Sequence, residues 1–186
     1  TGKSTTAKLV AQKLGFTYLD TGAMYRCVTL SVLKNDVHLD DKQNLLLLLN
    51  KIDIQFKKRG SKISVVLNGE DVSDHIRKTE VTKNVSAVSS IKEVRSFLVE
   101  NQRKIAKNND CVVEGRDIGT IVFPQAEVKV FLIADVRIRA ERRQLELSKM
   151  GEEKSLDILI KEIEKRDNFD SNRDNSPLRK ASDAIE

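Results

Sequence analysis

The chain opens on Thr-Gly-Lys-Ser-Thr-Thr at residues 1–6, immediately ahead of an amphipathic helical pattern. This stretch matches the second half of the phosphate-binding loop G-x-x-x-x-G-K-[ST]. In such a loop the backbone N–H groups around Gly2 curve around a phosphate, Lys3 reaches the β- and γ-phosphates, and Ser4 binds Mg²⁺ through its hydroxyl. The helix that follows directs the positive end of its dipole at the anion. We therefore predict an ATP site formed by Thr1, Gly2, Lys3, Ser4 and Thr5, although Gly-Lys-Ser also occurs in ordinary turns.

The balance of charge favours an anionic partner without identifying it. The 186 residues include 33 Lys and Arg against 28 Asp and Glu, a formal net charge of +5. Such a balance fits a solvated lysine-rich surface, a nucleic-acid partner or a small, highly anionic ligand. Aromatic residues make up 4% of the chain and Trp is absent, which argues against the stacking surfaces that bind single-stranded nucleic acid.

Cysteine usage and the lengths of the apolar runs bear on the cellular compartment. Cys27 and Cys111 lack metal-ligand spacing and lie among apolar neighbours, so we expect both to be reduced thiols of the core. Reduced thiols are typical of cytosolic proteins. The apolar run Leu45–Leu49 is far too short to cross a bilayer. We expect a cytoplasmic protein with no membrane partner.

A second helix start suited to an anion follows the first. Apolar periodicity predicts a helix, a strand and a helix in succession, over residues 6–14, 16–19 and 23–33. Gly15 is expected to end the first helix in a left-handed conformation, and Asp20 precedes the second. The strand therefore delivers Thr21, Tyr25 and Arg26 to a helix N-terminus, where the helix dipole favours negative charge.

The pattern changes to two-residue alternation after a helix that Asp40 or Asp41 caps and that runs to about Lys51. Polar and apolar residues then alternate in three short segments, at residues 53–56, 62–67 and 70–72. Asn68-Gly69 predicts a hairpin between the last two. We interpret this region as a small antiparallel insert.

Helices and buried strands return in the second half of the chain. Helices are predicted over residues 80–88, 91–107 with Ser90 as cap, 136–149 and 155–168. Apolar runs predict parallel strands over residues 111–113 and 128–133, and Ala184-Ile185 begins a further one. The turn at 114–120 follows the first of these strands, at the strand end where open α/β sheets place ligands.

Four features that accompany phosphate chemistry occur together: the loop at Gly2–Thr5, the Asp20–Arg26 turn, the Gly115–Asp117 turn and an arginine-rich C-terminal third. With them the chain resembles the bacterial cytidylate kinase family of nucleoside monophosphate kinases. The matching stretches are residues 18–26, 67–73, 114–124 and 166–173. The resemblance implies transfer of the γ-phosphoryl group of ATP to CMP or dCMP, giving CDP or dCDP, with Mg²⁺ bound alongside ATP.

By this resemblance, arginines hold the phosphate of CMP. Arg26, Arg116 and Arg173 stand at family positions that bind it, with the Thr21 hydroxyl nearby. Because the attacking phosphate oxygen is already ionised at pH 7, the reaction needs positioning and charge neutralisation but no general base. Arginine suits this task because its planar fork binds phosphate through two donors and keeps its proton. Taken singly, each could equally be a surface arginine.

The helix over 136–149 carries four arginines. The resemblance implies that two of them, Arg142 and Arg143, face the phosphates of ATP from a mobile lid. Gly151 is placed to permit lid movement. The alternative interpretation is a basic, solvent-exposed helix. The predicted catalytic groups are Lys3, Arg116, Arg142, Arg143 and Arg173.

Base selection requires a hydrogen-bond acceptor opposite the amino group of cytosine. Asp117 is the candidate, because a carboxylate accepts from N4 whereas uracil presents an acceptor there, at a loss of about 1–3 kcal/mol. The resemblance adds Arg95 and Ser86 to the base contacts, and assigns Asp170 with Arg166 to the ribose. Alternatively, Asp117 is a structural turn carboxylate, and Arg95 and Ser86 are helix-surface residues. Asp170 and Arg166 would then form an ordinary salt bridge.

The predicted fold is α/β, a P-loop NTPase-type parallel sheet flanked by helices, with a small antiparallel insert and a helical lid. We expect one kinase domain: a core in residues 1–52, 76–136 and 152–186, a monophosphate-side lobe at about 53–75 and a lid at about 137–151. A strand ahead of Thr1 and a strand and helix beyond Glu186 would complete it. We expect a monomer whose partners are nucleotides. The alternatives are another small-molecule P-loop kinase, of thymidylate or shikimate type, and a basic nucleic-acid-binding module.

Overall fold

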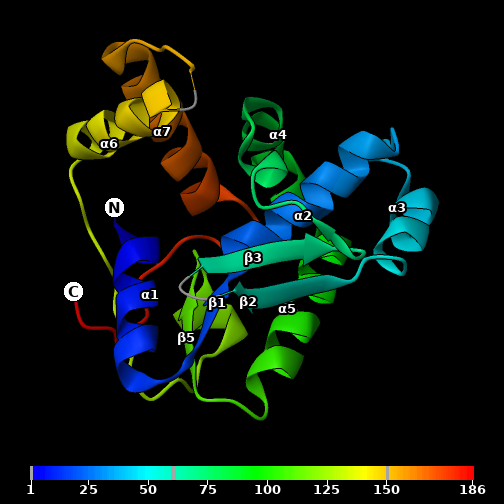
Figure 1. Ribbon diagram of the computed structural model, residues 1–186, viewed down its shortest axis with the longest axis horizontal. Helices are drawn as coiled ribbons and strands as arrows, with labels where there is room; N and C mark the ends of the chain where they lie inside the picture. The colour runs from blue at the N-terminus through cyan, green and yellow to red at the C-terminus, as the bar shows by residue number, and fades with distance from the viewer. Residues whose placement is uncertain (1, 60–61, 150) are drawn as a thin grey trace. The chain divides into compact units, whose positions relative to one another are not determined.

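A computed structural model describes residues 2–59, 62–149 and 151–186 (Figure 1). Thr1, which we predicted to contact ATP, lies outside the described residues. The chain divides into two compact units, one formed by residues 1–6 with Arg116–Glu186 and the other by Ala7–Gly115. Each unit is described by itself.

Helices and strands alternate along much of the chain, so the fold is mixed α/β. The helices are α1 (Lys3–Leu14), α2 (Thr21–Lys34), α3 (Lys42–Leu49), α4 (Thr79–Ser90), α5 (Lys92–Ala106), α6 (Val136–Lys149) and α7 (Leu156–Asn172), with short helical turns η1 (His75–Arg77) and η2 (Ile118–Val122). The strands are β1 (Thr17–Asp20), β2 (Ile54–Arg59), β3 (Lys62–Leu67), β4 (Glu70–Asp71) and β5 (Cys111–Glu114).

Strands β1 and β5, both predicted from the sequence, pair in parallel. Their register runs from Thr17 opposite Cys111 to Asp20 opposite Glu114, so both strands end at the same level. Asp20 then caps α2, its Oδ1 accepting from the Ala23 N–H at 2.9 Å. The helix therefore begins two residues earlier than predicted, directly at the carboxyl end of the sheet.

Helix α2 is the most buried element of this unit. It contributes to two apolar clusters, one shared with α3, α4 and α5 and the other with β3, η1 and α4. Leu19, Val28 and Leu98 are fully buried in the first cluster. Cys27, in the second, is a free thiol whose pKa burial raises to about 12, whereas the free thiol of Cys111 is only partly buried. The core therefore forms around the helix that carries Thr21 and Arg26.

The antiparallel insert is confirmed as a three-stranded sheet in the order β2-β3-β4. Asn68 and Gly69 link β3 and β4 with φ values of +50° and +88°, the left-handed pair that a tight two-residue hairpin requires. The Ser73 hydroxyl accepts from the Val65 N–H at 2.9 Å and ties the end of the insert to β3.

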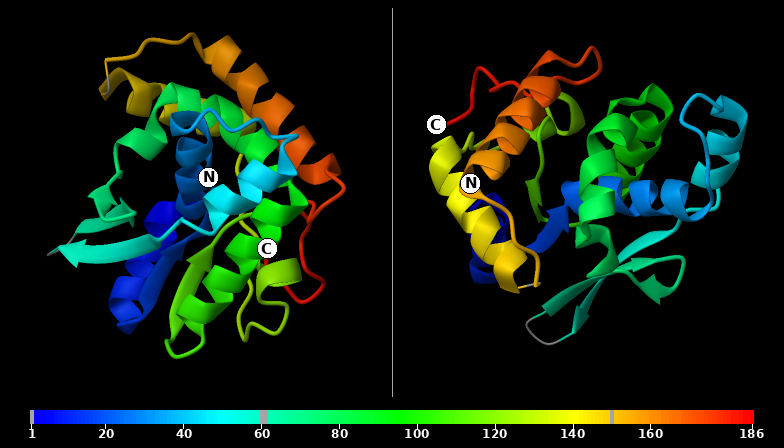
Figure 2. Two further views of the ribbon diagram at one scale, coloured as in Figure 1. Left: turned by 90° about the vertical axis from the view of Figure 1, so that its right-hand side faces the viewer. Right: turned by 90° about the horizontal axis from the view of Figure 1, so that it is seen from above.

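Helices α6 and α7 pack side by side in the other unit (Figure 2). Their shared core holds the fully buried Ala140, Leu147 and Leu159. Ser155 caps α7, as the predicted boundary implied, with its hydroxyl accepting from the Ile158 N–H. The predicted range of α6 is confirmed at both ends.

The predicted buried strand over 128–133 is wrong. Val128 and Ile133 are 72% and 64% exposed. Within the described residues the segment pairs through one parallel bridge, Val130 with Ile185, in which Phe131 N–H donates to Ile185 and Ile185 N–H donates to Lys129. Its apolar composition indicated a preference for burial, but a strand also needs a neighbour along its length.

One smaller expectation also fails. Ser90 does not cap α5, because it belongs to the last turn of α4 and its hydroxyl donates to the Ala87 carbonyl, while Ile91 precedes α5 without a side-chain cap. The helix predicted over 6–14 is confirmed within α1, which buries Ala11 and leaves Val10 and Leu14 39% and 56% exposed.

Candidate functional site

The glycine of the predicted phosphate loop has the backbone that such a loop needs. Gly2 has a φ of +83°, a left-handed value that favours glycine. Its carbonyl accepts from the Thr6 N–H at 3.0 Å and so opens α1. Lys3 and Ser4 therefore stand in the first helical turn, where the backbone N–H groups and the dipole favour an anion.

Arg142 lies beside this loop, although 140 residues separate the two in sequence. A Cβ added at Gly2 would lie 3.2 Å from Arg142 Nη1. A side chain at Gly2 would require this guanidinium to shift by a few tenths of an ångström. The structure thus brings one of the two predicted lid arginines to the phosphate loop. Its neighbour Arg143 instead pairs with Glu146 on the same helix, at 3.2 Å.

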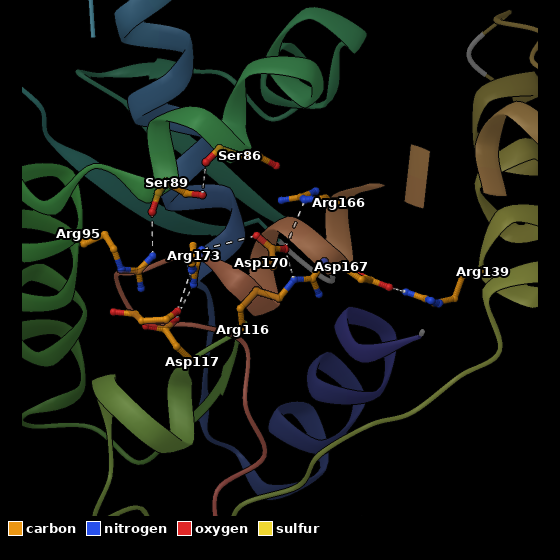
Figure 3. Close-up of polar contacts among 11 residues, drawn as sticks. Ser86, Ser89, Arg95, Arg116, Asp117, Arg139, Arg166, Asp167, Asp170 and Arg173 are labelled. Atoms are coloured by element: carbon orange, nitrogen blue, oxygen red, sulfur yellow. Dashed lines mark hydrogen bonds and ion pairs between the residues drawn. The ribbon is translucent and has the colours of Figure 1, made fainter. Parts of the chain in front are cut away.

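Three arginines converge on one buried carboxylate, and we call this group the Asp170 cluster: Arg116, Asp117, Arg166, Asp170 and Arg173 (Figure 3). Arg116 Nε donates to Asp170 Oδ2 at 3.0 Å, and Arg166 Nε lies 3.6 Å from the same oxygen. Arg173 contacts Asp170 Oδ1 at 3.6 Å and Asp117 Oδ1 at 4.0 Å. Five of the predicted site residues are therefore linked in one network of ion pairs.

Local structure explains how α7 supplies this cluster. Arg166 and Asp170 are four residues apart and thus share one side of the helix. Arg173 follows the last residue of α7, where its backbone N–H donates to Phe169 and its Nε donates to the Ser176 carbonyl at 2.8 Å. These contacts fix the Arg173 side chain at the helix end.

The remaining two members follow strand β5. Arg116 and Asp117 lie in the turn between β5 and η2, and the Asp117 carbonyl accepts from the Ile121 N–H at 2.9 Å. The turn directly after a parallel strand is thus held by the short helical segment that follows it. This is the strand end at which the sequence predicted a ligand.

Burial makes the electrostatics of the Asp170 cluster strong. The side chains of Asp170 and Arg173 are 1% and 4% exposed, while those of Arg116 and Arg166 are each 31% exposed. Burial, together with the neighbouring positive charge of Arg116, lowers the pKa of Arg166. Arginine nevertheless remains charged at neutral pH. Three guanidinium groups face two carboxylates, so the cluster is suited to receive an anion.

Thr21 is held at the carboxyl ends of β1 and β5. Its hydroxyl donates to the Glu114 carbonyl at 2.7 Å, and the Glu114 carboxylate accepts from the Tyr18 hydroxyl. Because a hydroxyl carries one proton, Thr21 would have to rotate away from Glu114 to donate to a phosphate. Burial first, and then the charge of Glu114, raise the pKa of the neighbouring Asp20.

Arg26, predicted to hold the CMP phosphate, makes contacts within its own unit. Its Nη1 donates to the Ile76 carbonyl at 3.1 Å and to the Thr82 hydroxyl at 2.9 Å. These bonds connect α2 to η1 and α4. The structure brings Arg116 and Arg173 together, and it places Arg26 in the other unit.

Ser86 and Arg95, the predicted base contacts, are linked through Ser89 (Figure 3). The Ser89 hydroxyl donates to the Ser86 carbonyl at 3.0 Å, and Arg95 Nη1 donates to the Ser89 carbonyl at 3.0 Å. Arg95 is 4% exposed, so it is not the helix-surface residue that its position in the sequence suggested.

Sequence reasoning missed several residues that position the predicted ones. Glu114 and Tyr18 were not singled out, yet they flank Thr21. Arg139 pairs with Asp167 at 2.5 Å and joins α6 to α7 beside the Asp170 cluster. The register of two strands and the packing of two helices create these pairs, and only the adjacency of Asp167 to Arg166 was visible in the sequence.

Two further features of the described residues concern metal binding and membrane spanning. Across residues 2–59, 62–149 and 151–186, no three His, Cys, Asp or Glu side chains gather so that they could hold a metal ion. In the part of the chain that the structure describes, no helix has the length and apolarity that a membrane span requires.

The loop at Gly2 with its neighbouring arginine, and the Asp170 cluster at a strand end, define a class: α/β proteins that bind phosphate groups at helix starts and through arginines. The sequence matches the profile of the cytidylate kinase family over residues 1–186. The chain belongs to the cytidylate kinase family. Membership implies the P-loop fold and the use of ATP.

Individual relatives agree with this assignment. The chain is 52% identical over 185 residues to a cytidylate kinase from Halalkalibacterium halodurans, a match that covers 100% of this chain and 83% of the relative. It is 49% identical to a cytidylate kinase from Lactobacillus gasseri, covering 100% and 80%. It is 48% identical to one from Carboxydothermus hydrogenoformans, covering 99% and 83%.

Proposed function

We propose that this protein transfers the γ-phosphoryl group of ATP to CMP and dCMP, giving CDP and dCDP by in-line displacement. Membership of the cytidylate kinase family supports the activity. The observation that carries the proposal is the Asp170 cluster, in which Arg116, Arg166 and Arg173 share one buried carboxylate. Such a cluster presents cations to a phosphate in a fixed geometry.

The proposed chemistry requires no proton transfer from the acceptor. The attacking group is a phosphate oxygen that is ionised at neutral pH, and the difficulty lies in bringing two anions together. We assign Arg116 and Arg173 to the acceptor phosphate, with Arg26 and Thr21 completing that subsite. Lys3, Arg142 and Arg143 would neutralise charge on the ATP phosphates. The position of Arg142 beside Gly2 supports its part in this assignment.

Mg²⁺ is the metal that the reaction would use. Ser4, in the first turn of α1, would place its hydroxyl on the ion, and the phosphates of ATP and water would supply the other ligands. When bound, the ion would neutralise charge that develops on the transferring group.

Cytosine selection is assigned to Asp117, with Arg95 and Ser86 as further base contacts. The buried Asp117 lies 4.0 Å from Arg173, and carboxylate oxygens accept hydrogen bonds, which suits the amino group of cytosine. We assign the ribose to Asp170 and Arg166, which are neighbours on α7.

We further propose three functional parts: a core, a monophosphate-side lobe at about 53–75 and a lid at about 137–151. The compact antiparallel sheet of β2, β3 and β4 supports the lobe. The helix α6 and the left-handed Gly151, with a φ of +76° and open space around it, support a lid that turns at this glycine. We expect the protein to act as a monomer in the cytoplasm.

A coupled assay of ADP release with a panel of acceptors tests the proposal. With ATP and Mg²⁺, CMP and dCMP should give the highest kcat/KM, above UMP, dTMP and shikimate. A preference for dTMP or shikimate would assign the chain to another kinase activity and overturn the proposal.

A further inference from the structure

Helix α2 places an aromatic side chain next to the proposed substrate residues. Tyr25 is four residues after Thr21, on the same side of the helix, and immediately before Arg26. It is 8% exposed and packs in the apolar cluster with Val85 and Val88 of α4 and Val94 and Leu98 of α5. The ring is therefore held by three helices.

The guanidinium of Arg95 lies over this ring. Arg95 Cζ is 5.2 Å from the centroid of the Tyr25 ring, and Nη1 donates to the Ser89 carbonyl at 3.0 Å. Ser89 is in the last turn of α4, where the helix dipole favours a cation. The Tyr25 ring of α2 and the Ser89 carbonyl of α4 thus fix the Arg95 side chain, which is 4% exposed.

The two contacts have different consequences for the guanidinium. Removing a cation from water costs free energy. Attraction to the negative face of an aromatic ring offsets part of this cost, most strongly where water is excluded. A ring on the face of a guanidinium uses none of its N–H groups, because these point outward in its plane. The Tyr25 ring therefore restrains the position of the Arg95 guanidinium without using one of its hydrogen-bond donors.

We propose that Tyr25 is a positioning residue for nucleotide selection: its ring holds the Arg95 guanidinium in the plane in which that group meets the base of the monophosphate. The inference rests on the proposed function, which assigns Arg95 to the base. It adds a residue with no contact of its own to the substrate in this assignment, and it predicts an effect on binding of the acceptor without an effect on ATP.

A purely structural account makes a different prediction. In that account Arg95 closes the C-terminal end of α4, Tyr25 fills the core, and loss of either lowers the stability and all kinetic constants together. Steady-state kinetics of Tyr25→Phe, Tyr25→Leu and Tyr25→Met, with CMP and ATP varied separately, distinguish the two accounts. Thermal unfolding of each variant identifies those that fold.

The expected result is selective. Tyr25→Phe keeps the ring and should retain the wild-type KM for CMP. Tyr25→Leu should raise the KM for CMP about tenfold, the scale of one buried cation–ring contact, with kcat changed less than threefold and KM for ATP unchanged. Tyr25→Met, an unbranched residue that adapts to irregular gaps, should give the same pattern and serves if the Leu variant does not fold.

A double-mutant cycle with Arg95→Met completes the test. If the ring acts through the guanidinium, Tyr25→Leu should add less than twofold to the KM for CMP in the Arg95→Met background. Independent, multiplicative effects would overturn the inference, as would equal changes in the KM values for CMP and ATP. Failure of the proposed function looks different, because the wild-type protein would then not prefer CMP and dCMP.

Discussion

At the scale of single residues, Asp117 carries the sharpest prediction about selectivity. Asp117→Ala removes the carboxylate proposed to accept from the cytosine amino group. The ratio of kcat/KM for CMP to that for UMP should fall by about 1–3 kcal/mol, a factor of roughly 5 to 150. The ratio is the readout because Asp117 also pairs with Arg173, so the absolute rate for both acceptors should fall as well.

Asp167→Ala is the matched control for that experiment. Asp167 is a carboxylate of the same unit that pairs with Arg139, and its loss should leave the CMP-to-UMP ratio unchanged. If Asp117→Ala also leaves the ratio unchanged, its assignment as the base reader is wrong and the turn carboxylate interpretation holds.

Asp20 gives a prediction about pH and stability. Burial raises its pKa above the ordinary 3.8, so the native state keeps a proton that the unfolded chain has released. The stability that this residue contributes is therefore greatest below about pH 4 and is lost as the pH rises through the native pKa. Asparagine caps helices as well as aspartate. Asp20→Asn should therefore gain stability relative to the wild type as the pH rises from 4 to 7, measured by urea unfolding.

Asp41 provides the opposite case on a neighbouring helix. It caps α3, and hydrogen bonds from the Asn44 backbone and side chain lower its pKa. Its contribution is present above the ordinary pKa and lost as the pH falls. Asp41→Asn should therefore lose stability relative to the wild type as the pH rises toward the ordinary 3.8, and should show no further relative change from pH 4 to 7, where Asp20→Asn gains. An equal relative gain for both variants from pH 4 to 7 would contradict the assignment of the Asp20 shift.

At the scale of elements, the β3–β4 hairpin depends on backbone geometry alone. Gly69 has a φ of +88°, and a Cβ there would meet no atom within 4 Å. Gly69→Ala should therefore lower the free energy of unfolding by about 1 kcal/mol through the left-handed backbone. Lys83→Ala, at an exposed position of α4, should change it by less than about 0.5 kcal/mol. Equal effects of the two substitutions in chemical denaturation would exclude this explanation.

Periodicity predicted the elements well wherever local rules decide them. The α6 range, the β3 range and the Asn68-Gly69 hairpin are confirmed because helix period, strand alternation and turn chemistry all act within a few residues. The segment 128–133 failed because pairing depends on a distant partner. Ser90 failed because two helices meet there and the first of them includes it.

The site was predicted unevenly for the same reason. The pair Arg166–Asp170 follows from helical spacing. The contact of Arg116 with Asp170 spans 54 residues in sequence, and no local pattern contains it. The proximity of Arg142 to Gly2 likewise depends on tertiary packing. The family resemblance selected the residues, whereas their partners became visible only in the structure.

At the scale of the whole molecule, the net charge of +5 separates two kinds of partner. The arginines of the Asp170 cluster are buried or partly buried around a carboxylate and do not line an open face, which favours a small anion over a nucleic acid. CMP at about 100 times its Kd should stabilise the protein by about 2.7 kcal/mol, measured as a rise in Tm. Fluorescence anisotropy with single-stranded RNA should show only weak binding; tight binding that weakens steeply with salt would favour the alternative.

The surplus of positive charge in the Asp170 cluster has a practical consequence. Three guanidinium groups against two carboxylates will attract any compact dianion, not only the phosphate of a nucleotide. Sulfate and inorganic phosphate should therefore compete with the acceptor. Constants measured in phosphate buffer would overstate the KM for CMP relative to those obtained in a zwitterionic buffer of equal ionic strength.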